Sequence, residues 1–218
     1  MAASRNKPSN NLPARVAAFL AARTSGDERL SVGLSGGCDS VVLVHILVEL
    51  GFGEQLDAIH VHHGLSPNAG RWVTFCTDYC QRLGLACRVA HVEVARDSGL
   101  GLEAAARAAR YQVFSGMAAD ALLLGHHQGD QAETVLFNLL RGAGVTGAAA
   151  IPNDRRQGHL RILRPLLDVS RNEIEAYARA AQLEWIDDES NADTTLSRNF
   201  MRHEVLTALA ERFPAAEK

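Results

Sequence analysis

The feature that most constrains the fold is a regular alternation of short apolar segments with longer segments of helical periodicity. The short apolar segments, which predict strands, lie at 29–34, 58–62, 87–92, 121–124 and 162–163. The segments that predict helices lie at 12–20, 39–50, 71–83, 102–117, 130–140, 171–181 and 199–210. Strands of this kind, separated by helices, are typical of a parallel sheet. The sequence therefore predicts an α/β fold, a parallel β-sheet with helices on both faces, and a ligand site where the strand order changes direction.

Length and composition exclude several other classes. The chain has 218 residues, 47 % of them apolar and 22 % charged, which is typical of a globular domain and not of a disordered or fibrous chain. No apolar run approaches the roughly 18 residues of a membrane span, and residues 1–13 lack the apolar segment of a secretion signal. The four cysteines form no C-x-x-C pair. We therefore expect a cytoplasmic protein without membrane association.

The strongest local motif is a hexapeptide between a predicted strand and a predicted helix. It consists of Ser35, Gly36, Gly37, Cys38, Asp39 and Ser40. The glycines allow a tight turn, and the helix N-terminus adds backbone donors and a positive dipole, so the motif predicts an anion site. Asp39 fits such a site if a divalent cation joins it to phosphates. The alternative is a helix start that is merely capped by serine or aspartate.

Histidines follow two of the predicted strands. They are His60, His62 and His63 after one strand, and His126 and His127 after another. Their spacing does not match a zinc motif, and no cysteine lies nearby in sequence. We expect contact with a nucleotide or substrate rather than with a metal, and His60 can also be a satisfied residue inside its strand.

Charged pairs at helical spacing lie on two predicted helices. Asp130 and Glu133 share one helix face, as do Arg107 and Arg110. The alternatives are favourable acids at a helix N-terminus and a solvated charged face. Residues 141–164 contain five arginines and one aspartate, which indicates either an RNA-facing surface or a solvated loop.

Together the motifs resemble a known family. The hexapeptide resembles the pyrophosphate loop of the N-type ATP pyrophosphatases. Further motifs are HVHHGL at 60–65, GHHQGDQAET at 125–134, RGAG at 141–144, RPLL at 164–167, WIDDESN at 185–191 and RNFMR at 198–202. In this order and spacing the chain resembles the tRNA(Ile)-lysidine synthetase family over about residues 28–213.

The resemblance implies a fold and a reaction. The fold is the adenine-nucleotide α-hydrolase-like three-layer sandwich of the PP-loop ATPases. The reaction is ligation of free L-lysine to position 2 of the wobble cytidine of an isoleucine tRNA. It uses ATP and Mg²⁺, proceeds through an adenylated cytidine, and releases pyrophosphate and AMP.

The resemblance also implies roles for individual residues. The catalytic set is Asp39, Arg110, Asp130 and Glu133. The ATP and pyrophosphate set is Ser35, Gly36, Gly37, Cys38, Asp39, Ser40, His62 and His126. Asp130 and Glu133 bind lysine and Asp39 holds Mg²⁺, while the substrate or tRNA set is Arg107, Arg141, Arg198 and Arg202. The family usually has two consecutive acids where this chain has Gly129 and Asp130, so the charge beside the lysine site is reduced.

The sequence also predicts the organisation of the chain. We expect a catalytic domain over 1–190, with an N-terminal tail and helix at 1–27. Residues 191–218 are expected to form a helical extension toward the C-terminal domains that family members usually carry. The oligomeric state stays open, with a homodimer among the alternatives. The other functions considered are a thiolase-like PP-loop enzyme that modifies tRNA and a non-catalytic module that binds tRNA or a nucleotide.

Overall fold

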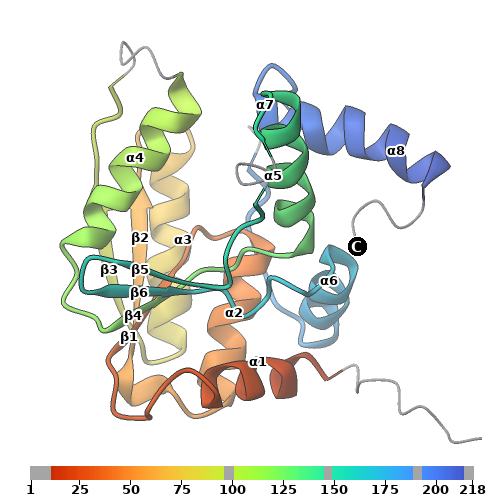
Figure 1. Cartoon of the computed structure of the whole chain (residues 1–218). Helices are drawn as coiled ribbons and strands as arrows, with labels where there is room; N and C mark the ends of the chain where they lie inside the picture. Colours follow the sequence, from red (N-terminus) through yellow and green to blue (C-terminus); the bar gives the residue numbers. More distant parts are fainter. Residues whose placement is uncertain (1–10, 96–100, 145–148, 189–192, 214–218) are drawn as a thin grey trace, which may run out of the picture.

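The computed structural model describes residues 11–95, 101–144, 149–188 and 193–213 (Figure 1). Within these ranges one sheet contains the strands β1 (Leu30–Gly33), β2 (Leu56–His62), β3 (Ala86–His91), β4 (Ala121–Leu123), β5 (Asp154–Gln157) and β6 (Leu160–Leu163). The first helices are α1 (Leu12–Ala21), α2 (Cys38–Glu49), the 3₁₀ turn η1 (Gly53–Gln55), α3 (Ala69–Arg82) and α4 (Leu102–Ser115). They are followed by α5 (Gln128–Leu140), α6 (Arg171–Ala180), α7 (Ser197–Phe200), a π-helical segment (Met201–Val205) and α8 (Leu206–Arg212). Every predicted strand and helix is present, with boundaries that differ by a few residues.

The strand order places a change of direction in the middle of the sheet. The order is β3-β2-β1-β4-β6-β5, and all neighbouring pairs are parallel except β5 with β6. The chain moves outward from β1 to β2 and β3, and then returns to β4 on the other side of β1. The loops that follow β1 and β4 therefore diverge from the same point, where open α/β sheets bind their ligands.

The edge strand β5 is the element that the sequence analysis did not predict. Its sequence, DRRQ, has no apolar alternation, and it pairs only with β6 across a two-residue turn in which Gly158 has φ +61°. The side chains of Asp154 and Arg161 form an ion pair across the hairpin. Charged side chains are tolerated on an edge strand because only one of its sides is hydrogen-bonded. The sheet is therefore mostly parallel, with one antiparallel edge.

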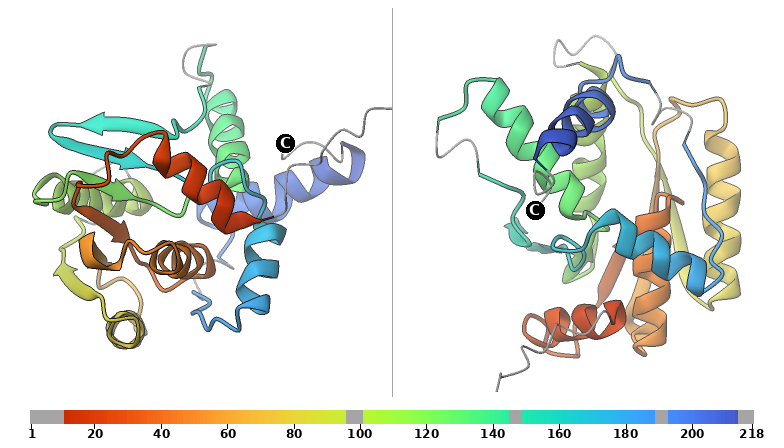
Figure 2. Two further views of the ribbon diagram at one scale, coloured as in Figure 1. Left: turned by 90° about the horizontal axis from the view of Figure 1, so that it is seen from below. Right: turned by 90° about the vertical axis from the view of Figure 1, so that its right-hand side faces the viewer.

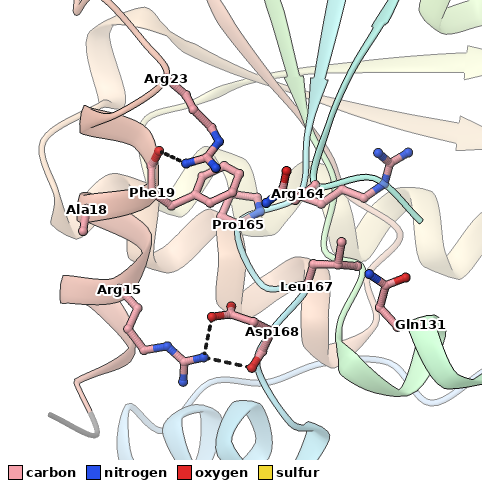
Figure 3. A pocket seen from close by; sticks show the side chains of 10 residues that line it. Arg15, Ala18, Phe19, Arg23, Gln131, Arg164, Pro165, Leu167 and Asp168 are labelled. Atoms are coloured by element: carbon pink, nitrogen blue, oxygen red, sulfur yellow. Dashed lines mark hydrogen bonds and ion pairs between the residues drawn. The ribbon is translucent and has the colours of Figure 1, made fainter. Parts of the chain in front are cut away.

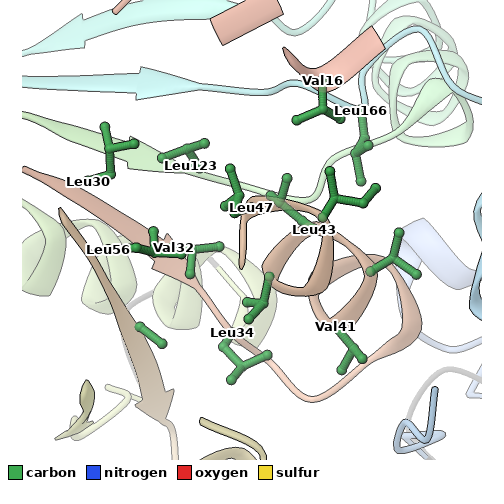
Figure 4. Packing of buried hydrophobic residues seen from close by; sticks show 14 of the residues in the cluster. Val16, Leu30, Val32, Leu34, Val41, Leu43, Leu47, Leu56, Leu123 and Leu166 are labelled. Atoms are coloured by element: carbon green, nitrogen blue, oxygen red, sulfur yellow. The ribbon is translucent and has the colours of Figure 1, made fainter. Parts of the chain in front are cut away.

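Helices cover both faces of the sheet, as predicted. The right-hand view of Figure 2 shows the strands between α3 on one side and α4 on the other. The larger core joins α1, α2, α3 and α6 to the strands. Figure 4 shows Leu43 and Leu47 of α2 next to residues of β1 and β4, and Val16 of α1 beside Leu166. The smaller core packs Phe114 and Met117 against the opposite face. Because α2 is buried between the sheet and α6, its N-terminus has a fixed position beside the loop after β1.

The C-terminal elements pack against α5. Figure 1 shows α7 and α8 beside α5, and Met201 and Leu206 are buried there. The expected domain boundary at residue 190 and the ends of the expected tail and extension, 1–10 and 214–218, lie outside the described residues. In the described part of the chain, no helix has both the length and the apolar character needed to cross a membrane.

Candidate active site

Side-chain hydroxyls close the loop between β1 and α2. The Ser40 hydroxyl accepts a hydrogen bond from the Ser35 backbone N–H (3.2 Å) and donates one to the Gly37 carbonyl (2.9 Å). The Ser35 hydroxyl accepts from the Gly37 N–H (3.2 Å). No side chain among the described residues caps the N-terminus of α2. The predicted phosphate loop is therefore a preformed turn that leads into a helix N-terminus open to an anion.

Two glycines are required by this geometry. Gly36 has φ +93°, and a Cβ there would lie 3.3 Å from Ile186 Cδ1. A Cβ on Gly125, in the loop after β4, would lie 3.1 Å from the backbone C and O of Asp39 and 3.2 Å from the Ser40 N. Only glycine leaves room for two backbones to approach this closely. The β4–α5 loop and the first turn of α2 are thus in direct contact.

A cavity of about 430 Å³ lies at the carboxyl ends of β1, β2 and β4. Its lining includes ten of the residues that the sequence analysis selects: Ser35, Gly37, Cys38, Asp39, Ser40, Arg110, His126, Asp130, Arg198 and Arg202. These residues come from four separate segments of the chain. The fold therefore brings the phosphate loop, one of the two helix acids and three of the arginines around one space.

Five other selected residues lie outside the lining of this cavity. The His62 ring packs against that of His91, with centroids 4.7 Å apart. Arg107 lies over the Tyr111 ring at 5.0 Å, and Arg141 over the Phe137 ring at 5.3 Å. The remaining two selected residues are Gly36 and Glu133. Gly36 supports the loop through its carbonyl, which accepts a hydrogen bond from the Ile186 N–H (2.9 Å).

His127 connects the phosphate loop to the helix acids. Its Nε2 lies 3.8 Å from a carboxylate oxygen of Asp39 and 3.8 Å from one of Asp130. Burial raises the pKa of Asp39, although the nearby His127 and Arg171 oppose that shift. Burial also acts to raise the pKa of Asp130, but His127, together with its backbone N–H, outweighs that effect and lowers it. Two nearby carboxyls are thus shifted in opposite directions, as at many catalytic sites.

Glu133 lies behind Asp130 and is paired with Arg202. The Glu133 side chain is 2 % exposed, and its Oε1 accepts a hydrogen bond from Arg202 Nε at 2.6 Å. Arg202 Nη2 also lies 3.9 Å from Asp130. Burial raises the pKa of Glu133 even though Arg202 opposes the shift. A single guanidinium from the π-helical segment therefore faces both acids of α5.

His63 and Cys38 are two further residues of the cavity wall. The guanidinium of Arg110 lies 3.4 Å from His63 Nε2, and burial lowers the pKa of His63 to about 4. Cys38 is 6 % exposed, and burial raises the pKa of its thiol to about 12. A protonated, buried thiol is a poor nucleophile, so Cys38 contributes to the wall of the cavity and not to covalent chemistry.

Three residues of the site, His63, His127 and Arg171, are absent from the catalytic and binding sets that the resemblance implies. His127 is part of the histidine pair at 126–127, which the sequence already singles out. Its contact with Asp39, however, depends on the sheet topology, which no local pattern shows. Arg171 lines the cavity. It is the first residue of α6, directly after the capping residue Ser170, and the sequence at such a position predicts only an exposed charge. His63 lines the cavity in the place expected for His62. No local pattern distinguishes these two histidines.

A second hollow, of about 500 Å³, lies between α1 and the segment 164–168 (Figure 3). Its polar groups are largely used internally: Arg15 pairs with Asp168 and Glu173, and Arg23 donates to the Phe19 carbonyl. Figure 3 shows the Arg164 guanidinium directed away from α1. The hollow lies apart from the phosphate loop, and the chemistry is concentrated in the first cavity.

Solved structures resemble this fold. A U34-tRNA thiolase NcsA from Methanococcus maripaludis, with its 4Fe-4S cluster, aligns with TM-score 0.76 and 19 % identity over 94 % of this chain and 74 % of that one. An NMN synthetase from Francisella tularensis aligns with TM-score 0.56 and 13 % identity over 82 % of this chain and 73 % of that one. At these identities the likeness concerns the fold alone.

Curated sequences are more similar. The tRNA(Ile)-lysidine synthase of Aromatoleum aromaticum is 52 % identical over 200 residues, which cover 91 % of this chain and 47 % of that protein. The enzyme of the same name from Nitrosomonas europaea is 45 % identical over 204 residues, covering 91 % and 44 %. The chain thus spans about half the length of the curated relatives it matches. Residues 8–209 match the model of the PP-loop domain, and the chain belongs to this family.

Proposed function

We propose that the chain is the catalytic domain of a tRNA(Ile)-lysidine synthetase, which joins lysine to the wobble cytidine of an isoleucine tRNA at the expense of ATP. The observation that carries the proposal is the meeting of the phosphate loop with Asp130 of the α5 acid pair at one cavity. The match to the PP-loop domain spans residues 8–209, which include every residue that lines the cavity. The proposed substrates place the activity in the cytoplasm.

The phosphate loop and the cavity arginines suit the adenylation step. The N-terminus of α2 and the hydroxyls of Ser35 and Ser40 would hold the β- and γ-phosphates as pyrophosphate leaves. Arg110 and Arg198 line the same cavity and would stabilise charge on the α-phosphate as the cytidine O2 attacks it. The bond between the α-phosphorus and the bridging oxygen breaks, and an adenylated cytidine forms.

Asp39 fits a bound Mg²⁺. Its Oδ1 is buried and has no hydrogen-bond partner within the described part of the chain. A carboxylate oxygen is the ligand that Mg²⁺ prefers, together with the phosphates of a nucleotide. When bound, the ion would neutralise charge on the leaving pyrophosphate. Desolvation of Asp39, which raises its pKa in the free protein, would then be compensated by a cation.

The acids of α5 suit the second step. The ε-ammonium of lysine would bind between Asp130 and Glu133, where Arg202 lies in this structure. Lysine binding therefore requires Arg202 to release Glu133. Because burial raises the pKa of Glu133, this carboxylate is the better proton acceptor of the two. The deprotonated amine attacks C2 of the cytidine, the bond from C2 to the adenylated oxygen breaks, and AMP leaves.

Arginines of the β5–β6 hairpin offer a surface for RNA outside the cavity. Arg155 and Arg156 are exposed on β5. Phosphate contacts make binding depend on salt. Replacing both arginines by alanine should weaken tRNA binding and reduce its salt slope, in a filter-binding assay over a range of salt concentrations. An unchanged slope would exclude this surface.

The test of the function is incorporation of labelled lysine into an isoleucine tRNA transcript, with ATP and Mg²⁺. We expect the chain to incorporate lysine and Asp39→Asn and Asp130→Asn to lose the activity. Asp78→Asn is the matched control, because Asp78 is exposed on α3 and does not line the cavity. Activity retained in both cavity variants would refute the site.

The other candidate functions predict different results. A module that only binds tRNA or a nucleotide would bind both ligands without releasing pyrophosphate. A thiolase-like enzyme would release pyrophosphate and transfer sulfur without incorporating lysine. Measuring pyrophosphate release and lysine incorporation in the same reaction distinguishes the three.

A further inference from the structure

Arg164 is a buried cation whose contacts are all neutral. Its side chain is among the largest buried groups and is 1 % exposed. It donates to His126 Nδ1 (3.2 Å), to the Pro152 carbonyl (2.7 Å) and to the Tyr111 hydroxyl (3.4 Å). Among the residues that the structure describes, no carboxylate forms an ion pair with it. A buried charge without a counterion is unfavourable unless other groups compensate it.

The contact with Arg164 determines where the His126 ring carries its proton. A guanidinium Nε–H can only donate, so His126 Nδ1 must present a lone pair. Burial lowers the pKa of His126 to about 4, against the pull of Asp130, so the ring is neutral near pH 7. The ring proton is therefore on Nε2, for which no hydrogen bond is formed within the described residues.

The two side chains differ in their relation to the cavity. His126 lines it, and Arg164 does not. Arg164 lies behind the histidine, at the end of β6, and its guanidinium also reaches α4 through Tyr111. Arg164 thus does not line the cavity itself, and the ring of His126 connects it to a ligand there.

We propose that Arg164 is a positioning residue that holds His126 as the Nε2–H tautomer, so that the ring donates to an oxyanion of a ligand in the cavity. The identification of that oxyanion as a phosphate of the nucleotide rests on the proposed function. A donor chain that runs from a cation through a neutral ring is polarised along its length, which strengthens the terminal donor. The opposite tautomer would turn a lone pair toward the anion and repel it.

A purely structural role for Arg164 predicts a different outcome. In that case the guanidinium only joins β6, α4 and the segment at Pro152, and its loss lowers stability without changing the ring of His126. The tautomer of the ring separates the two roles, because nitrogen chemical shifts distinguish a protonated from an unprotonated ring nitrogen.

The test is ¹⁵N NMR of the histidine rings in the full chain, with His126→Gln used to assign the signals. In the wild type we expect an unprotonated Nδ1 and a protonated Nε2. In Arg164→Met the chemical shifts of the two ring nitrogens should become averaged, because both tautomers are then populated. The dissociation constant for ATP should rise about tenfold, which corresponds to the loss of one charge-assisted hydrogen bond. Arg164→Lys, which keeps a cationic donor, should restore part of both effects.

Arg161→Met is the matched control, because Arg161 lies on β6, the strand that leads directly into Arg164, and pairs with Asp154 away from the cavity. It should leave the His126 signals and ATP binding unchanged. A protonated Nδ1 in the wild type would overturn the proposal, even if Arg164→Met does not fold. Unchanged ring signals in a folded Arg164→Met would overturn it as well. A wild type that shows the expected tautomer but does not bind ATP would refute the proposed function alone.

Discussion

Replacing Gly125 by alanine would force apart the two loops that form the site. The new Cβ would lie 3.1 Å from the Asp39 C and O and 3.2 Å from the Ser40 N, whereas ordinary contact begins at 3.4 Å. These neighbours are backbone atoms in the first turn of α2, so they cannot move aside as the end of a side chain can. The turn or the β4–α5 loop must therefore shift by a few tenths of an ångström.

The size of the effect follows from that shift. Overpacking of this kind typically lowers the free energy of unfolding by about 1–3 kcal/mol. The backbone donors of the turn move with it, and loss of one hydrogen bond to the phosphates, worth about 0.5–1.5 kcal/mol, should weaken ATP binding by about 3- to 10-fold. Both losses should occur together, because the same backbone atoms carry the packing and the phosphate donors.

Urea unfolding and calorimetric titration with ATP would measure the two losses. Gly70→Ala is the control, because Gly70 lies in α3 and a Cβ there meets no heavy atom within 4 Å. That variant should bind ATP normally and be equally stable or up to about 1 kcal/mol more stable. If Gly125→Ala unfolds at the wild-type midpoint and binds ATP with the wild-type affinity, the contact between the loops does not set the geometry of the site.

Two further variants test the ion pairs. Glu133→Ala leaves the half-buried Arg202 without its principal partner, so we expect a loss of roughly 2 kcal/mol in urea unfolding, and an unchanged midpoint would contradict the contact. The Ser170 hydroxyl lowers the pKa of Glu173, with its backbone N–H and Arg15 adding to the effect. The stabilisation from a lowered carboxyl pKa is present above the ordinary glutamate value and is lost as pH falls, so Glu173→Gln should cost about 1 kcal/mol at pH 7 and little at pH 3. An equal loss at both pH values would refute the electrostatic explanation.

The parts of the site that could be predicted from sequence are those whose residues are neighbours in the chain. The phosphate loop is one continuous segment, and Asp130 and Glu133 stand one helical turn apart. A pattern within a few residues was therefore enough to identify them. The strands other than β5 were found for the same reason, because each is a short and mostly apolar segment.

The parts that could not be predicted depend on contacts between distant segments. Arg171 reaches Asp39 only because α6 packs on α2, and β5 forms only because β6 offers it an edge. Gly129 is another residue whose role depends on a contact that the sequence does not show. From the sequence, a glycine at this position indicates only that a charge is lost. In the structure a Cβ there would lie 2.8 Å from His127 Cε1, so an acid at this position requires the histidine ring to move.

The change in strand order has a consequence for how the protein reaches its active state. The pairing of β1 with β2 joins Leu30 to Leu56, whereas the pairing of β1 with β4 joins Leu30 to Ala121. Closing the longer loop is the entropically more demanding event, and non-local pairing slows folding. The phosphate loop alone can form with the first half of the chain, but the cavity exists only after β4 has joined the sheet. We therefore expect a nucleotide to bind late in refolding, and by mass action to stabilise the chain against opening of this one strand pair.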